Sequence, residues 1–142
     1  MSPEDVIAFV AGFAGVAAQT PGPGDGSPEI AWGDTFVYYD PDDRESARRM
    51  PFATIVVKDY PGFDEFSDLG REGAFRVNAG VGRERVPDAS GSVDYAAFDV
   101  LLPHPVYAKQ GWVSVVNPGV ATEALLRSLL TEAYERAKGR YR

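Results

Sequence analysis

Apolar residues recur at helical spacing near both ends of the chain. Ser2 and Pro3 favour a helix start, and apolar residues return every three or four positions after them. Leucines and alanines repeat in the same way from about Thr122 onward. Such stripes are typical of amphipathic helices that pack on a partner surface. We therefore predict a helix over residues 3–14 and a long C-terminal helix that begins near Thr122.

Short runs of β-branched and aromatic residues between these helices predict strands. The continuous apolar run at residues 52–58 is typical of a central strand, whereas the polar and apolar alternation at residues 74–79 is typical of a half-exposed strand. The other expected strands are a hairpin over residues 30–39, with its turn at residues 33–34, and a strand at residues 112–116.

The remaining segments predict a short helix and loops. Residues 95–102 have the spacing of a helix that turns Phe98 inward. The Gly- and Pro-rich residues 19–28 and the charged residues 40–50 are predicted as flexible loops. Together, the elements predict a single α+β domain over residues 1–142, with N-terminal and long C-terminal helices packed on a largely antiparallel sheet of about five strands.

Charge and composition narrow the function classes. The 142 residues include 14 Lys plus Arg and 21 Asp plus Glu, so the formal net charge is −7. Residues 1–40 hold six acidic and no basic residues, which excludes a generally basic nucleic-acid footprint. The absence of cysteine excludes disulfides, thiol nucleophiles and thiolate metal sites. The apolar stretch at residues 6–18 follows acidic residues and is short, so we predict no secretion signal, no membrane span and a cytoplasmic location.

The one histidine, His104, lies between Pro103 and Pro105. Two prolines restrain the backbone, so the imidazole is well placed as a general base or as a ligand-binding group. Capping of a neighbouring carbonyl at a rigid turn is the simpler interpretation. The acidic residues 40–45 lack the glycine and the closing glutamate of a calcium loop. We therefore predict no catalytic residue, no metal and no cofactor.

The loop over residues 59–70 alternates carboxylates with apolar residues. Asp64, Glu65 and Asp68 could pair for acid–base work, but a loop whose apolar residues attach it to the core is the simpler interpretation. Hydrolytic or isomerase chemistry at His104, with Asp68 or Tyr107 as its partner, is a third and weakest function hypothesis.

Arginines gather beside Gly80-Val81-Gly82, which follows an expected strand. A phosphate-cradling loop can stand at such a place, although a turn is the simpler interpretation. An anionic ligand is therefore the sharpest local hypothesis. The candidate ligand-binding residues share a polar or charged tip near predicted turns or strand ends: Trp32, Arg76, Asn78, Arg83, Arg85, His104 and Tyr107.

Several stretches resemble known small proteins. LPHPVY at residues 102–107, WVSV at residues 112–115 and the closing helix resemble the C-terminal half of the YjbR/MmcQ-like proteins. PFATIVVKD, FRVNAGVGRE and LLPHPVYA look like the signature stretches of a small bacterial family of unassigned function. The resemblance implies a compact α+β fold. It also implies a DNA-binding label, which YjbR-like proteins often carry because of a proposed double-winged surface.

These observations favour a non-enzymatic binding module. We expect a cleft between the sheet and the terminal helix that binds a small anionic ligand or a protein partner. The alternative is nucleic-acid binding through a local strip of Arg76, Arg83, Arg85 and the basic residues of 136–142. The YjbR-like resemblance suggests this alternative, and the net charge disfavours it, because phosphate neutralisation supplies most non-specific affinity.

Overall fold

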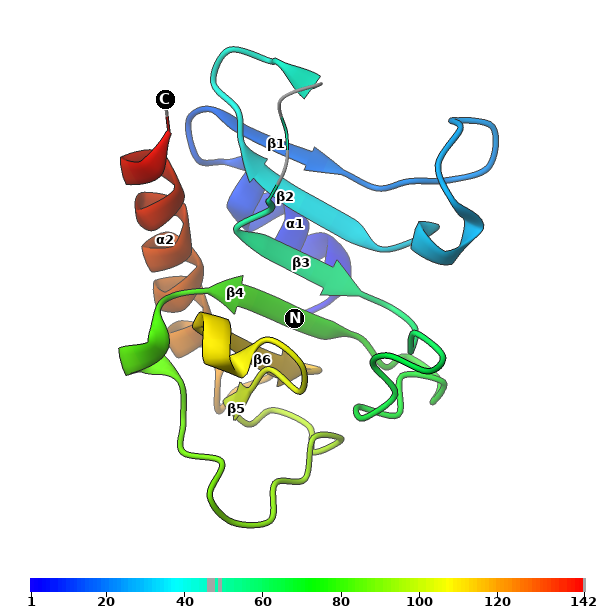
Figure 1. Cartoon of the computed structure of the whole chain (residues 1–142), viewed down its shortest axis with the longest axis vertical. Helices are drawn as coiled ribbons and strands as arrows, with labels where there is room; N and C mark the ends of the chain where they lie inside the picture. The colour runs from blue at the N-terminus through cyan, green and yellow to red at the C-terminus, as the bar shows by residue number, and fades with distance from the viewer. Residues whose placement is uncertain (46–47, 49, 142) are drawn as a thin grey trace.

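The computed structural model describes residues 1–45, 48 and 50–141. In this part of the chain, six strands form one antiparallel sheet. Its strand order is β1-β2-β3-β4-β6-β5, and two helices lie on one of its faces (Figure 1). The predicted α+β fold is confirmed. The helices and strands are α1 (Pro3–Ala11), β1 (Val16–Gln19), β2 (Thr35–Tyr39), β3 (Ala53–Val56), β4 (Arg76–Gly80), β5 (Leu102–Pro103), β6 (Trp112–Val116) and α2 (Glu123–Arg140).

The hydrophobic core lies between the helices and the sheet. Side chains alternate between the two faces of a strand, so every second residue of the inner strands points toward the helices. On α2, Leu130 is fully buried against them. These side chains fill the middle of the interface, and a hollow that both the sheet and α2 line lies at the C-terminal end of this helix, with Gly80 and Trp112 on one side and Arg136 and Arg140 on the other. The strand residues buried in the core include Val37, Ile55, Val77 and Val115.

The opposite face of the sheet carries a row of three polar side chains that ends at Phe36. Directly paired positions place Phe36, Thr54, Asn78 and Ser114 side by side across β2, β3, β4 and β6. The Asn78 amide donates to Thr54 Oγ1 at 2.9 Å, and Ser114 Oγ donates to Asn78 Oδ1 at 2.7 Å. The turn η4 (Ala108–Gln110) lies in front of this face, opposite the helices (Figure 1). The face without helices therefore has its own hydrogen-bonded interior.

Three predicted strands are confirmed, and the loop predictions are left open. The strands at residues 52–58, 74–79 and 112–116 are β3, β4 and β6, and β3 is an interior strand. Helix α1 is shorter than predicted and ends at Ala11. In the loop predicted over residues 40–50, residues 46, 47 and 49 lie outside the described residues. The flexibility of this loop and of residues 19–28 stays a prediction.

The predicted hairpin over residues 30–39 is wrong. Only its second half is a strand, β2, and the first half contains the 3-10 turn η1 (Glu29–Ala31). Strand β2 pairs instead with β1, which the sequence did not predict, and with β3. The carboxylate of Asp34 accepts from the amide of Val57 at 2.8 Å and from Lys58 Nζ at 3.1 Å. The turn at Asp34 is therefore tied to the end of β3.

The expected exposure of β4 and its preceding loop is also wrong. The alternation in β4 is present, yet Arg76 is 2% and Asn78 1% exposed, because a loop covers their face. In that loop, Leu69 is buried as expected, whereas Phe63 and Phe66 are about half exposed. Polar contacts and the buried Leu69, rather than these aromatic rings, hold the loop on the sheet.

The predicted helix over residues 95–102 is absent. Asp99 has a φ of 57°, which is incompatible with a right-handed helix, and Phe98 is 47% exposed. The Asp99 carboxylate accepts from the amides of Gly119 at 2.8 Å and Thr122 at 3.0 Å. These bonds satisfy N–H groups where α2 starts, at and just before its N-cap residue Thr122.

Replacing Asp99 should weaken the start of α2. The hydroxyl of Thr122 and the amide of Gly119 lower the pKa of Asp99 from 3.8 to about 2. The stabilising effect of the ionised carboxylate is therefore present above pH 3.8 and is lost as the pH falls toward 2. We expect Asp99→Asn to lower the melting temperature by several degrees at pH 7, and by less as the pH falls toward 2, measured by circular dichroism.

Asp88→Asn is the matched control. Local bonds from Ser90 also lower the pKa of the Asp88 carboxyl, but Asp88 is exposed and these bonds join no second element. Its replacement should leave the melting temperature almost unchanged. Equal effects of the two substitutions would contradict the capping role of Asp99.

Candidate ligand-binding site

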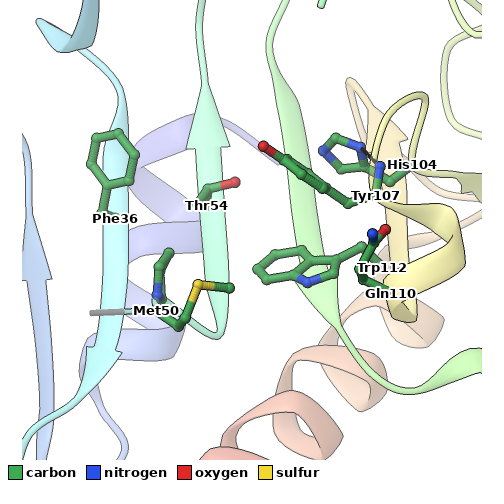
Figure 2. Close-up of a pocket in the computed structure, with 8 residues that line it drawn as sticks. Phe36, Met50, Thr54, His104, Tyr107, Gln110 and Trp112 are labelled. Atoms are coloured by element: carbon green, nitrogen blue, oxygen red, sulfur yellow. Dashed lines mark hydrogen bonds between the residues drawn. The ribbon is translucent and has the colours of Figure 1, made fainter. Parts of the chain in front are cut away.

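A cavity of about 330 Å³ opens on the polar face of the sheet. Figure 2 shows Tyr107 and Trp112 extending across β4 toward Thr54, with Phe36 beyond Thr54 on β2. The walls are mainly aromatic and aliphatic, which is the usual lining of small-molecule sites. Met50, Gln110 and His104 also border this cavity.

A second hollow of about 260 Å³ adjoins the first, because both are lined by Phe36, Thr54, His104 and Tyr107. This hollow extends to the buried side chains of Arg76 and Asp64. We call the two together the sheet-face cavity. It has an apolar outer part and a polar inner end.

The polar end is built around the Arg76 guanidinium. Nη1 and Nη2 donate to the two oxygens of Asp64 at 3.1 and 2.6 Å. Nη1 also donates to Ser67 Oγ, and Nε donates to Asn78 Oδ1, each at 2.8 Å. The bidentate pair balances the guanidinium charge and joins the loop between β3 and β4 to the sheet.

His104 is held as a neutral hydrogen-bond donor. Its Nδ1 accepts from the amides of Val106 and Tyr107, both at 3.0 Å. Burial and the Arg76 guanidinium lower the pKa of His104 from 6.5 to about 3, although Asp64 opposes the shift. The ring is therefore neutral at pH 7. Since Nδ1 accepts hydrogen bonds, the single ring proton is on Nε2.

Two donors converge at the inner end of the cavity. The protonated Nε2 of His104 lies 3.5 Å from Nη2 of Arg76, and two donors cannot bond to each other. One Nη2 hydrogen is used by Asp64. The other Nη2 hydrogen and the Nε2 hydrogen have no acceptor among the described residues. An oxygen atom between them would accept from both.

The structure brings together four of the seven sequence-predicted ligand-binding residues. Arg76, Asn78, His104 and Tyr107 all line the sheet-face cavity. The other three lie elsewhere. Trp32 lies before β2, and its backbone oxygen accepts from Lys58 Nζ. Arg83 is exposed on the turn η3 (Arg83–Arg85), and Arg85 forms an ion pair with Glu132 at 2.8 Å.

The sequence did not point to Phe36 or Thr54 as site residues, and it suggested Asp64 as a carboxylate for acid–base work rather than as a partner of Arg76. Phe36 and Thr54 join the site through the pairing of β2 and β3 with β4. That pairing becomes visible in a sequence only after the strand order is known. Asp64 meets Arg76 because the intervening loop folds back over the sheet, and no local spacing signals such a contact.

Acid–base chemistry at His104 finds little support in this geometry. The carboxylate of Asp68 lies 3.4 Å from Arg71 Nε and does not line the cavity. Nε2 of His104 already carries a proton, so it donates rather than accepts. The predicted capping of a carbonyl by His104 is wrong, because the ring accepts from two backbone amides of the same turn. Among the described residues, no group of three or more His, Asp or Glu side chains could hold a metal ion.

The fold and the cavity define a small α+β protein with an aromatic hollow on the helix-free face of its sheet. Residues 1–142 match the family model DUF6194, a family of unknown function, and the chain belongs to that family. No curated protein and no solved structure matches the chain. None of the helices in the described part of the chain is long and apolar enough to cross a membrane. The YjbR-like resemblance and the cytoplasmic location stay predictions.

The buried neutral state of His104 should make the protein sensitive to acid. An unfolded chain takes up a proton near pH 6.5, whereas folded His104 does so only near pH 3. Stability is therefore fully present above pH 6.5 and is lost as the pH falls. We expect the free energy of unfolding to drop by about 2 kcal/mol between pH 7 and pH 5, measured by denaturant titration.

His104 is the one histidine of the chain, so its ring signals in an NMR titration need no assignment by mutation. The signals should show no protonation between pH 7 and pH 5. His104→Gln should remove most of the stability change between these pH values. An imidazole that titrates near 6.5 in the folded protein would contradict the buried neutral ring.

Proposed function

We propose that this protein binds a small organic molecule in the sheet-face cavity. The observation that carries the proposal is the pair of convergent donors, Nε2 of His104 and Nη2 of Arg76, at the inner end of an otherwise apolar cavity. In sites of this kind, apolar contacts supply most of the affinity and a few polar groups fix the orientation. The ligand has an aromatic body and an oxygen acceptor.

The charges around the inner end favour an uncharged acceptor. Arg76 and Asp64 form a bidentate pair with no net charge, and His104 is neutral at pH 7. A buried anion would lose its hydration there without meeting an unbalanced positive charge. A carbonyl oxygen can accept from both donors at a smaller desolvation cost. Any negative charge on the ligand must therefore lie on another part of the molecule.

The state of His104 supports binding rather than catalysis. A general base needs an unprotonated nitrogen that faces the substrate. In His104, the unprotonated Nδ1 faces two backbone amides, and the nitrogen nearest Arg76 carries the proton. The ring can therefore orient a ligand oxygen, but it cannot accept a proton at that position.

Nucleic-acid binding through an arginine strip has less support. Arg76 is 2% exposed and paired with Asp64, so it cannot contact a phosphate backbone. Arg85 is paired with Glu132. The strip is reduced to Arg83 and the basic residues near the end of α2.

Two naphthalene probes, one with a hydrogen-bond acceptor and one without, test the proposal. We expect 2-naphthamide to bind at least about fivefold more tightly than 2-ethylnaphthalene, since one additional hydrogen bond contributes about 1 kcal/mol. Titrations followed by NMR should show the largest shifts at the Trp112 indole and the His104 ring.

Tyr107→Ala and Tyr95→Ala form a matched pair of variants. Each tyrosine has a phenylalanine ring at a centroid distance of 6.0 Å, Phe63 for Tyr107 and Phe66 for Tyr95, but only Tyr107 lines the cavity. Tyr107→Ala should weaken 2-naphthamide binding about tenfold, since an aromatic wall of the site is removed. Tyr95→Ala should leave it unchanged. Equal losses in both variants, or no binding of either probe, would refute the proposal.

A further inference from the structure

A third hollow, of about 270 Å³, lies next to the sheet-face cavity and differs from it in chemistry. It shares Met50, Pro51, Gln110 and Trp112 with the larger part of the sheet-face cavity, so Trp112 borders both. Figure 2 shows Trp112 lying between Met50 and Gln110. The far side of the hollow is formed by the last turns of α2, which contribute two arginines. We call this hollow the arginine hollow.

The two arginines, Arg136 and Arg140, are one helical turn apart on α2 and line the same hollow. Like charges at this spacing repel each other. Other arginines near this helix have partners, since Arg85 pairs with Glu132 and Arg127 with Glu123. Neither Arg136 nor Arg140 forms an ion pair with another described residue. The hollow therefore has two exposed guanidinium groups that form no ion pair among the described residues.

The Arg136 guanidinium lies against the backbone at Gly82. Gly82 has a φ of 102°, and a Cβ there would lie 3.1 Å from Nη1 of Arg136 and 2.8 Å from Oε1 of Glu84. The amide of Gly82 donates to the carbonyl of Gly111 at 3.0 Å. Gln110 and Trp112, the neighbours of Gly111 in the chain, line the hollow together with the arginines of α2.

The position of the arginines at the helix end has a simple structural explanation. Positive charge near a helix C-terminus interacts favourably with the helix dipole. That effect acts on any cation in the last turn, and Lys138 on another side of the helix provides one. The helix dipole does not explain why Arg136 and Arg140 line one hollow together with the Trp112 indole and the Gln110 amide. Convergent arginines are instead a common arrangement for binding phosphoryl groups.

We propose that the arginine hollow binds the phosphoryl group of a small molecule whose aromatic body occupies the sheet-face cavity. This inference rests on the proposed function, because the aromatic body is the part that the sheet-face cavity holds. Trp112 lies at the boundary, where a ring can contact one side of it while the phosphoryl group meets Arg136 and Arg140 on the other. Glu84 opposes an anion at this place, so its carboxylate limits the affinity.

A pair of probes that differ only in the phosphoryl group tests the inference. At low ionic strength, 1-naphthyl phosphate should bind at least tenfold more tightly than 1-naphthol, measured by isothermal titration calorimetry. The double substitution Arg136→Gln and Arg140→Gln should abolish this difference and leave 1-naphthol binding unchanged. Glu84→Gln should strengthen 1-naphthyl phosphate binding several-fold, since a nearby negative charge is removed.

Arg83→Gln is the matched control, because Arg83 is also exposed and basic but does not line the arginine hollow. It should leave both affinities unchanged. If 1-naphthol binds and the phosphoryl group adds nothing, or its gain survives the double substitution, the inference is overturned and the proposed function stands. If 1-naphthyl phosphate binding needs Arg136 and Arg140 but tolerates Tyr107→Ala, the phosphoryl site stands and the aromatic cavity is overturned as the second half of the site.

A nucleic acid would meet the same arginines through its backbone. Retention of a short DNA duplex at the ionic strength of the titrations, lost in the double variant, would assign the arginines to a macromolecule and overturn the small-molecule inference. The absence of such retention, together with tight binding of 1-naphthyl phosphate, supports it.

Discussion

The buried ion pair between Arg76 and Asp64 organises the face of the sheet that has no helix. Arg76 is 2% and Asp64 7% exposed, and removing one partner from such a pair costs about 3–5 kcal/mol, because the other charge stays buried without compensation. The pair joins the middle of the sheet to a loop whose phenylalanines are half exposed. On this face, polar contacts therefore help to hold a covering segment on the sheet, whereas apolar packing holds the helices on the other face. An alternative position of the loop would leave both charges without partners.

The same pair sets the chemistry of the cavity. The Arg76 guanidinium lies next to His104 and, together with burial, keeps that ring neutral. Asp64 balances the arginine, so the inner end of the cavity has hydrogen-bond donors but no net charge. Asn78 extends the hydrogen-bond network across the sheet. Its side-chain oxygen accepts from Arg76 and Ser114, and its side-chain amide donates to Thr54. The position and the charge of the site thus depend on this contact, whereas the location of the ring proton is set by the two backbone amides that donate to Nδ1 of His104.

The sequence predicts the parts of this fold that depend on local patterns. The strand at residues 112–116 and the long helix have strong apolar periodicity, and both are present. The hairpin over residues 30–39 fails because Asp34 bonds to the end of β3, which is distant in the chain. In the sequence, the polar residues Arg76 and Asn78 look solvent-facing. They are buried because a loop folds back over them. The polar interior was therefore visible in the sequence only as alternation, while its burial required the tertiary structure.

The acidic net charge says little about where an anion can bind, because many carboxylates are already engaged. Asp34 accepts from Val57 and Lys58, and Asp40 accepts from Arg48 Nε at 2.6 Å. These acids lie in residues 1–40, the part of the sequence with no basic residue, and they are balanced by groups that come later in the chain. What matters for a ligand is the charge that remains unpaired at a given hollow. At the end of α2, that remaining charge is positive, so an acidic protein can present a site for an anionic group beside an uncharged cavity.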